Sequence, residues 1–292
     1  MRFKINLIIA MTTLVMGLTA PAKALEVRLI PESPEQGDTI SVIIETDKPG
    51  EKPVVSMSKE NSSQETNYPA LPIDSNGLQY RAFLPTTPLD KSGKLIIRVK
   101  GEEETRNLAV WLREGDFPIQ RITLSPGKSS LQATELELNR VKELKNLVTP
   151  EKYWDGPFIR PNAARVSTVF GVQRYYNGVF AEDYYHRGVD YAGDYGSPVV
   201  APAGGIVRLV GLESEGFQIH GNTVGIDHGQ GVISIFLHLS RIDVAEGDVV
   251  EAGTQIGTVG DTGASAGPHL HWGLYVNGVS VDPGPWRFES IE

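Results

Sequence analysis

Three short motifs in the C-terminal half of the chain contain residues that could bind a metal ion and transfer protons. All six histidines lie after position 185, and the chain has no cysteine. A metal site would therefore use histidine nitrogen and carboxylate oxygen, since thiolate ligands and a cysteine nucleophile are excluded. The motifs are His186-Arg187-Gly188-Val189-Asp190, His238-Leu239 and His269-Leu270-His271.

The spacing within two of these motifs brings polar side chains to one side of the backbone. His186 and Asp190 are four residues apart, and the glycine and valine between them favour a strand, whose period of two puts both on the same face. His269 and His271 likewise share a face of a predicted strand, with the intervening leucine buried opposite. Each pair can therefore point into one site.

Two histidines and one carboxylate match the ligands of a catalytic zinc site, which keeps a fourth position for water. Two further histidines could take or give a proton, because the imidazole pKa of about 6.5 lies near neutral pH. A His-x-His pair alone is a weak signal. Its combination with the other two motifs in one glycine-rich region favours a metal site.

In this order, the three motifs resemble those of LytM/lysostaphin-type zinc metallopeptidases, the M23 family. The resemblance implies that His186, Asp190 and His271 bind one zinc ion per chain, and that His238 and His269 are catalytic. It also implies hydrolysis of peptide bonds in peptidoglycan stem peptides or cross-links by a zinc-activated water. One free histidine would take the proton and the other would bind the oxyanion, and either histidine fits either role.

The resemblance covers about residues 160–285 and departs from the family pattern at two positions. Phe236 stands where members often have tyrosine, and Ala266 stands in place of the threonine of a Ser-Thr-Gly segment. Neither change affects the five site residues, whereas some relatives lose ligands and only activate other hydrolases. The alternative function is accordingly a non-catalytic cell-wall binder or an activator of another peptidoglycan hydrolase.

Three other polar residues of this region have less defined roles. Arg174 follows the Phe170-Gly171 turn and could either line a groove or pin a loop. His228 lies between an aspartate and a glycine, which is typical of a structural position, and nothing in the sequence assigns chemistry to His220.

Three unrelated functions are excluded. The Gly263–Gly267 segment matches the Gly-x-Ser-x-Gly elbow of serine hydrolases, but a proline and a predicted strand follow it instead of a helix. A biotinyl or lipoyl carrier domain needs a lysine at a hairpin tip, and no lysine follows Lys152. A sugar-phosphotransferase domain would work in the cytoplasm, which an export signal contradicts.

The N-terminal residues 1–24 are typical of a secretory signal peptide. Arg2 and Lys4 precede a 16-residue apolar run, Ile5–Ala20, and Ala22-Lys23-Ala24 offers a small-x-small cleavage site. The run is shorter than the roughly 20 residues that cross a bilayer. We therefore expect export to the periplasm, cell envelope or exterior, without stable membrane insertion after cleavage. Loss of this segment changes the net charge from −9 to −12, which disfavours nucleic acid as a partner. The partner that the resemblance to the M23 family implies is peptidoglycan.

The remaining sequence predicts an all-β protein with one helix. Residues 25–115 contain about six short β-branched segments separated by turn residues, which is typical of an immunoglobulin-like β-sandwich. Residues 151–292 contain short apolar stretches separated by glycine or proline, which predict an antiparallel β-sheet or barrel-sandwich domain. The resemblance to the M23 family implies that this is the peptidase domain.

Residues 116–150 are predicted to be a linker that contains an amphipathic helix within Ser129–Val148. Its apolar residues recur at spacings of three and four and would form the face that packs on a domain. They are Leu138, Val141, Leu144 and Val148, and the charged residues Glu135, Glu137, Lys142 and Lys145 would lie mostly on other faces.

Overall fold

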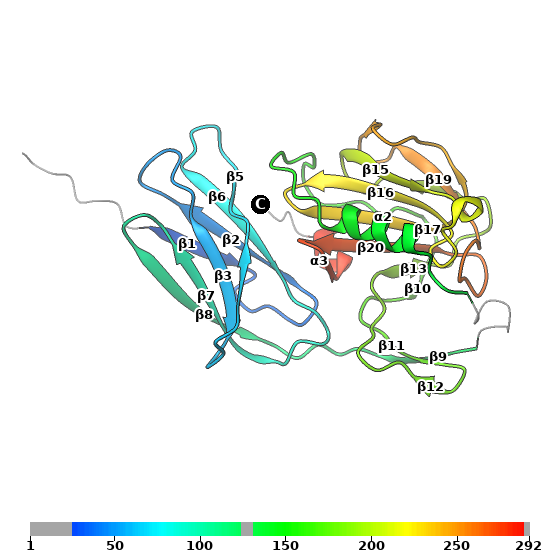
Figure 1. Cartoon of the computed structure of the whole chain (residues 1–292), viewed down its shortest axis with the longest axis horizontal. Coiled ribbons are helices and arrows are strands. Elements are labelled where there is room, and N and C mark those ends of the chain that lie inside the picture. Colours follow the sequence, from blue (N-terminus) through cyan, green and yellow to red (C-terminus); the bar gives the residue numbers. More distant parts are fainter. Residues whose placement is uncertain (1–24, 124–130, 289–292) are drawn as a thin grey trace, which may run out of the picture.

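The computed structural model describes residues 25–123 and 131–288 and is almost entirely β-structure, in two adjoining parts (Figure 1). The predicted signal, residues 1–24, lies outside the described residues. Within the described ranges, no helix is long and apolar enough to cross a membrane.

Two four-stranded antiparallel sheets form the N-terminal part, with the orders β1-β2-β6-β5 and β4-β3-β7-β8. The strands are β1 Glu26–Ile30, β2 Thr39–Glu45, β3 Val54–Lys59, β4 Glu65–Tyr68, β5 Leu71–Pro72, β6 Gln79–Pro85, β7 Gly93–Lys100 and β8 Thr105–Leu112. The six expected β-branched segments form β1, β2, β3, β6, β7 and β8, and β4 and β5 are additional. One apolar core joins the two sheets, with Ile40 and Ile44 from one sheet and Ile97 and Leu112 from the other fully buried. That this sandwich is of the immunoglobulin type stays a prediction.

A ten-stranded antiparallel sheet forms most of the C-terminal part, as its short apolar stretches predict. Its main path runs β10-β13-β20-β17-β16-β15-β18, and β14, β19 and β21 pair at its sides. The strands are β10 Val166–Thr168, β13 Val189–Tyr191, β14 Pro198–Val200, β15 Gly205–Gly211, β16 Asn222–Gly229, β17 Val232–Ile242, β18 Val249–Val250, β19 Gln255–Val259, β20 Leu270–Val276 and β21 Val279–Val281. Large buried side chains such as Tyr191, Phe236 and Trp272 fill its core.

A small third sheet lies beside the main one, in the order β12-β11-β9. It consists of β9 Ile119–Ile122, β11 Gln173–Tyr176 and β12 Val179–Phe180. Strand β9 belongs to the linker, for which no strand is predicted, and it pairs in parallel with β11. The linker therefore forms part of the C-terminal structure (Figure 1).

Helix α2, Glu135–Lys145, lies across the ten-stranded sheet (Figure 1). Val141 and Leu144 pack on that sheet as predicted, but the expected placement of three other residues is wrong. Leu138 and Val148 are 53% and 42% exposed, and Val148 lies beyond the helix. Glu137 is fully buried on the packed face, because hydrogen bonds from the neighbouring 217–222 turn compensate its charge.

Two very short helices, η1 Glu213–Glu215 and α3 Pro283–Trp286, complete the described elements. Helix α3 helps to join the two parts of the molecule, since Trp286 packs against Phe83 of β6 with ring centroids 5.4 Å apart. Backbone contacts reinforce this junction, where Asp282 N–H donates to the Gly37 carbonyl at 2.8 Å.

His228 in β16 is fully buried, in agreement with a structural role. One ring nitrogen contacts the Gly204 carbonyl at 2.7 Å, and the other contacts the Ser234 hydroxyl at 2.8 Å. Burial lowers the pKa of His228 to about 4, so the folded protein holds this imidazole neutral.

This burial predicts a loss of stability on mild acidification. The unfolded chain protonates His228 near pH 6.5 but the folded chain only near pH 4, so the contribution is complete above pH 6.5 and is lost as the pH falls toward 4. The loss reaches up to about 3 kcal/mol. Thermal unfolding of wild type and His228→Gln between pH 8 and 4.5 checks it: the variant should be less stable at pH 8 and should lose less stability on acidification. Equal pH dependence in the two proteins contradicts the prediction.

Candidate metal centre

The pairing of β13 with β20 brings two of the predicted ligands together. Asp190 lies directly opposite His271 in this antiparallel ladder. Leu270, next to His271, is fully buried on the other face, as the strand period requires. His186 lies just before β13 and reaches the same place from the chain segment that leads into the strand.

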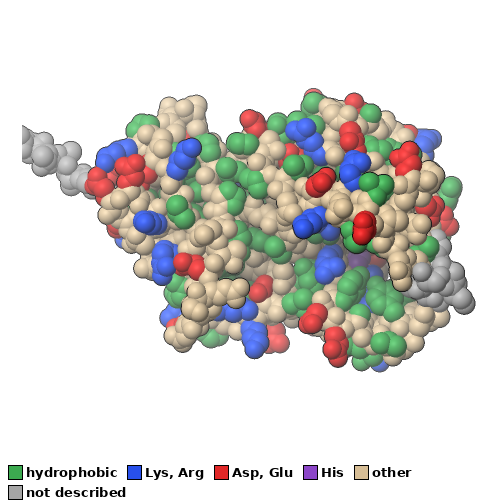
Figure 2. Space-filling model, viewed as in Figure 1, with side chains coloured by type: hydrophobic (Ala, Val, Ile, Leu, Met, Phe, Trp, Pro, Cys, Tyr) green, Lys and Arg blue, Asp and Glu red, His purple; other side chains and the backbone are tan. Residues whose placement is uncertain are grey.

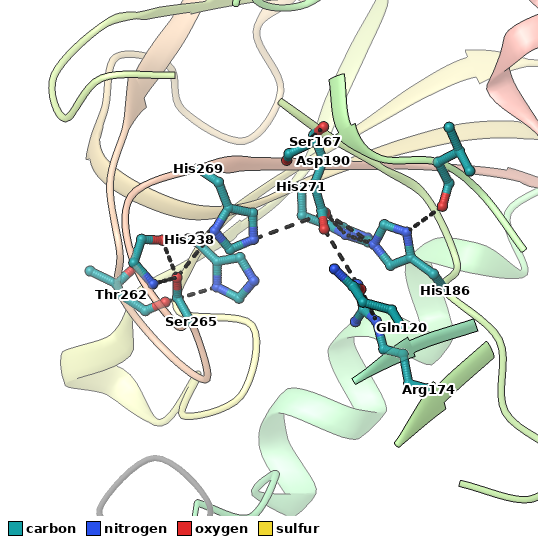
Figure 3. A network of polar contacts seen from close by, with 12 residues as sticks. Gln120, Ser167, Arg174, His186, Asp190, His238, Thr262, Ser265, His269 and His271 are labelled. Carbon is teal, nitrogen blue, oxygen red and sulfur yellow. Dashed lines mark hydrogen bonds and ion pairs between the residues drawn. The ribbon is translucent and has the colours of Figure 1, made fainter. Parts of the chain in front are cut away.

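Three ligand atoms converge at this point (Figure 3). Asp190 Oδ1 lies 3.0 Å from His186 Nε2 and 2.9 Å from His271 Nδ1, and the two nitrogens are 3.0 Å apart. Donors placed about 2 Å from a tetrahedral ion would lie roughly 3.3 Å from one another. The three atoms therefore fit a single small metal ion.

The hydrogen bonding of His186 strengthens this interpretation. Its Nδ1 lies 2.8 Å from the Val169 carbonyl, so the neutral ring donates Nδ1–H to that oxygen and has a lone pair on Nε2. That lone pair faces a carboxylate oxygen and a second imidazole nitrogen at about 3 Å. Three electron-rich atoms at such distances need a positive charge between them, either one shared proton or a metal cation.

The glycine of the first motif has a steric role. A Cβ atom on Gly188 would lie 2.4 Å from the Trp272 carbonyl and 2.8 Å from ring atoms of His271. Only glycine lets the segment between His186 and Asp190 pass this close to β20.

The second carboxylate oxygen of Asp190 faces Arg174 of β11. Arg174 Nη2 lies 3.4 Å from Asp190 Oδ2, and both side chains are about one-tenth exposed. Burial alone would raise the pKa of Asp190, but its contacts with the imidazoles of His186 and His271 hold that pKa well below the usual range. Asp190 is therefore a carboxylate, and Arg174 pins this ligand instead of lying free in a groove.

His238 reaches the site from β17 through an irregularity of that strand. The register between β16 and β17 shifts around this residue, and its backbone has φ of 64°, in the left-handed region. Such a bulge turns one side chain away from its regular position, at a cost of about 1–3 kcal/mol. His238 Nδ1 lies 2.8 Å from the Thr262 carbonyl, which leaves Nε2 without a proton.

His269 lies beside His238 at the entry to β20 (Figure 3). The two ring centroids are 4.9 Å apart. His269 Nδ1 lies 2.8 Å from the Gly267 carbonyl, while Nε2 lies 3.9 Å from Asp190 Oδ1. Both of these histidines are thus fixed through Nδ1 by a backbone carbonyl.

Burial lowers the pKa of His238 well below its usual value, and the neighbouring imidazoles of His269 and His271 lower it further. His238 is therefore neutral at pH 7 and can accept a proton. The site opens on the side of His269, whose side chain is 21% exposed, whereas that of His186 is 2% exposed. Histidine atoms are visible at the floor of a hollow in the C-terminal part (Figure 2).

The structure brings all five predicted site residues together. The rings of His220 and His228 contact Glu137 and Ser234 instead of the candidate ligands, and Phe236 is fully buried. Sequence reasoning did not identify Gln120 of β9, whose Oε1 accepts from Arg174 Nε at 3.3 Å. No local pattern indicates this contact, because Gln120 comes from a linker strand more than 50 residues away in sequence.

Residues 184–283, which include the three candidate ligands and both further histidines, match the sequence model of Peptidase family M23. The chain contains a peptidase M23 domain. The whole described architecture is also similar to a crystal structure assigned to peptidase M23 from Pseudomonas aeruginosa, with a TM-score of 0.60 over 89% of this chain and 96% of the other, at 24% identity. This likeness concerns the fold alone.

Two curated relatives extend the comparison. The uncharacterized metalloprotease of Haemophilus influenzae is 31% identical over 72% of this chain and 41% of its own length. Peptidoglycan DD-endopeptidase ShyC of Vibrio cholerae is 40% identical over 41% of this chain and 26% of its own length. The chain thus spans less than half the length of these relatives.

The ligand geometry of the M23 domain predicts one divalent transition-metal ion per chain. Asp190→Ala removes the only carboxylate among the three donors, so this variant should lose the ion on dialysis while wild type retains it. Elemental analysis of both proteins measures this. Asp194→Ala, which removes an exposed carboxylate four residues away, serves as the control and should keep the metal. Equal metal content in Asp190→Ala and wild type would show that the ligands are elsewhere.

Proposed function

We propose that the protein is an exported zinc-dependent endopeptidase that hydrolyses peptide bonds in peptidoglycan stem peptides or cross-links. One observation carries the proposal: three metal-ligand atoms converge beside two further histidines that are fixed through Nδ1. The name of the relative ShyC, a peptidoglycan DD-endopeptidase, supports the choice of substrate.

The donor set supports zinc as the metal. His186 and His271 offer nitrogen atoms and Asp190 offers one oxygen atom, a combination typical of catalytic zinc sites. Magnesium and calcium prefer sets made of oxygen atoms. When bound, zinc supplies a Lewis acid that acidifies water and polarises the scissile carbonyl.

The two remaining histidines would handle the protons of the reaction. His238 and His269 each donate Nδ1–H to a backbone carbonyl, so each keeps a free Nε2 that can accept the proton of the attacking water. Once protonated, the same nitrogen can stabilise the developing oxyanion or pass its proton to the leaving amine. The buried position of His238 excludes water from one side and strengthens such interactions.

The proposed substrate agrees with the sequence of the N-terminus. Peptidoglycan lies outside the cytoplasmic membrane, so an enzyme acting on it must be exported. The predicted signal in residues 1–24 supplies a route to the periplasm, envelope or exterior.

Separate substitutions should uncouple zinc binding from catalysis. We expect His269→Ala to retain zinc but to release fragments from purified sacculi at least about 100-fold more slowly, because a proton-transfer group is lost. Mass spectrometry of the released fragments measures the rate and identifies the bond cleaved, and elemental analysis of the same samples measures zinc.

A chelator should abolish cleavage by wild type, and added zinc should restore it. If His269→Ala digests sacculi as fast as wild type, or if wild type binds sacculi or stimulates another hydrolase without cleaving, the endopeptidase proposal is wrong.

A further inference from the structure

Helix α2 contains a fully buried carboxylate that lies outside the region matching the M23 family. Glu137 has no exposed surface, although it sits in the first turn of a short helix. One of its oxygens completes a capping box, since Glu137 Oε2 accepts from Thr134 N at 3.3 Å while Thr134 Oγ1 accepts from Glu137 N at 3.1 Å. The other oxygen points away from the helix, toward the peptidase domain.

That other oxygen, Oε1, accepts three hydrogen bonds from a single turn of the peptidase domain. The donors are Ile219 N at 3.0 Å, His220 N at 2.7 Å and His220 Nδ1 at 2.5 Å. Burial alone would raise the pKa of Glu137, but these hydrogen bonds from His220 lower it, so the group is ionised. An anion accepting three N–H groups fixes the turn more firmly than a neutral side chain could.

The carbonyls of the same turn face the catalytic side. His220 O accepts from His238 N at 3.0 Å, and Ile219 O accepts from Ala264 N at 2.9 Å. The turn thus holds the backbone of His238 and the backbone of the loop that contains Thr262. Thr262 in turn supplies the carbonyl that fixes His238 Nδ1.

The turn packs closely against the loop that contains Thr262. Asn222 N donates to Thr262 Oγ1 at 2.9 Å, and a Cβ on Gly221 would lie 2.5 Å from atoms of Thr262. His238 has the left-handed backbone conformation that is costly for a residue with a side chain. Such a conformation persists only where the surroundings determine it from several sides.

We propose that Glu137 is a positioning residue for His238. It acts through His220: the carboxylate fixes the turn, and the turn fixes both the strained backbone and the ring orientation of His238. The expected effect of Glu137 on the rate of cleavage rests on the proposed endopeptidase function. Glu137 contacts none of the zinc ligands, so zinc binding should not depend on it.

The test compares Glu137→Ala and Glu137→Gln with two control variants of the same helix. Val141→Ala removes buried apolar contacts of α2 but leaves in place the hydrogen bonds that Ile219 and His220 donate to Glu137. Glu135→Gln removes an exposed charge in the first turn of the same helix. We expect Glu137→Ala to lower kcat for peptidoglycan fragments about 10- to 100-fold, with KM and zinc content unchanged. Glu137→Gln, which keeps one acceptor oxygen, should recover part of the rate. Both controls should keep the wild-type kcat.

A second readout does not depend on activity. In NMR spectra of histidine side chains, the Nδ1–H of His238 should exchange slowly with solvent because Thr262 accepts it. Glu137→Ala should accelerate this exchange, whereas the Nδ1–H of His186, bonded to Val169, should keep its rate.

The outcomes separate this proposal from the proposed function. If wild type cleaves and Glu137→Gln and Glu137→Ala keep its kcat, or if Val141→Ala loses as much kcat as Glu137→Ala, the positioning role is wrong. If Glu137→Ala does not fold, the comparison of Glu137→Gln with Val141→Ala decides. If wild type does not cleave at all, the function fails, and the exchange rate of His238 still decides whether Glu137 positions it.

Discussion

The C-terminal part of the protein is organised around three electron-rich atoms that face one another across about 3 Å, His186 Nε2, Asp190 Oδ1 and His271 Nδ1. Their approach is unfavourable unless a positive charge lies between them. The ladder between β13 and β20 enforces it, because Asp190 and His271 are direct partners. Gly188 then allows the preceding segment to bring His186 within reach. The fold thus places three electron-rich atoms where a bound cation would offset their mutual repulsion.

Surrounding residues orient two of the three candidate ligands. Val169 determines which nitrogen of His186 is free, and Arg174 occupies the second oxygen of Asp190. The same kind of contact fixes His238 and His269, whose Nδ1–H groups donate to the backbone carbonyls of Thr262 and Gly267. Backbone carbonyls thus leave both Nε2 atoms free. The carbonyl partners of His186, His238 and His269 thus each favour the same tautomer, with the hydrogen on Nδ1 and a lone pair on Nε2.

Most of the fold and the grouping of the five candidate site residues could be predicted from the sequence, because strands and ligand motifs are local patterns. The alternation at Leu95, Ile97 and Val99 marks a buried strand face directly. The helix shows where this reasoning stops. Apolar spacing placed Leu138 in the core and left Glu137 outside, yet the reverse holds, because buried hydrogen bonds from a turn 80 residues later compensate the charge. Strand β9 was not predicted either, because it pairs with β11, which is distant in sequence, and a local pattern does not indicate such a contact.

The parallel pairing of β9 with β11 bears on how such proteins can be recombined. The chain enters the C-terminal part through β9, whose Gln120 contacts Arg174 beside the ligand Asp190. A chimera that joins a foreign N-terminal module at residue 151 would leave this strand and α2 behind, although every ligand would be present. The part of the chain that must be transferred as a unit is therefore longer than the region of the motifs. It begins before Ile119, within the segment that the sequence predicts to be a linker.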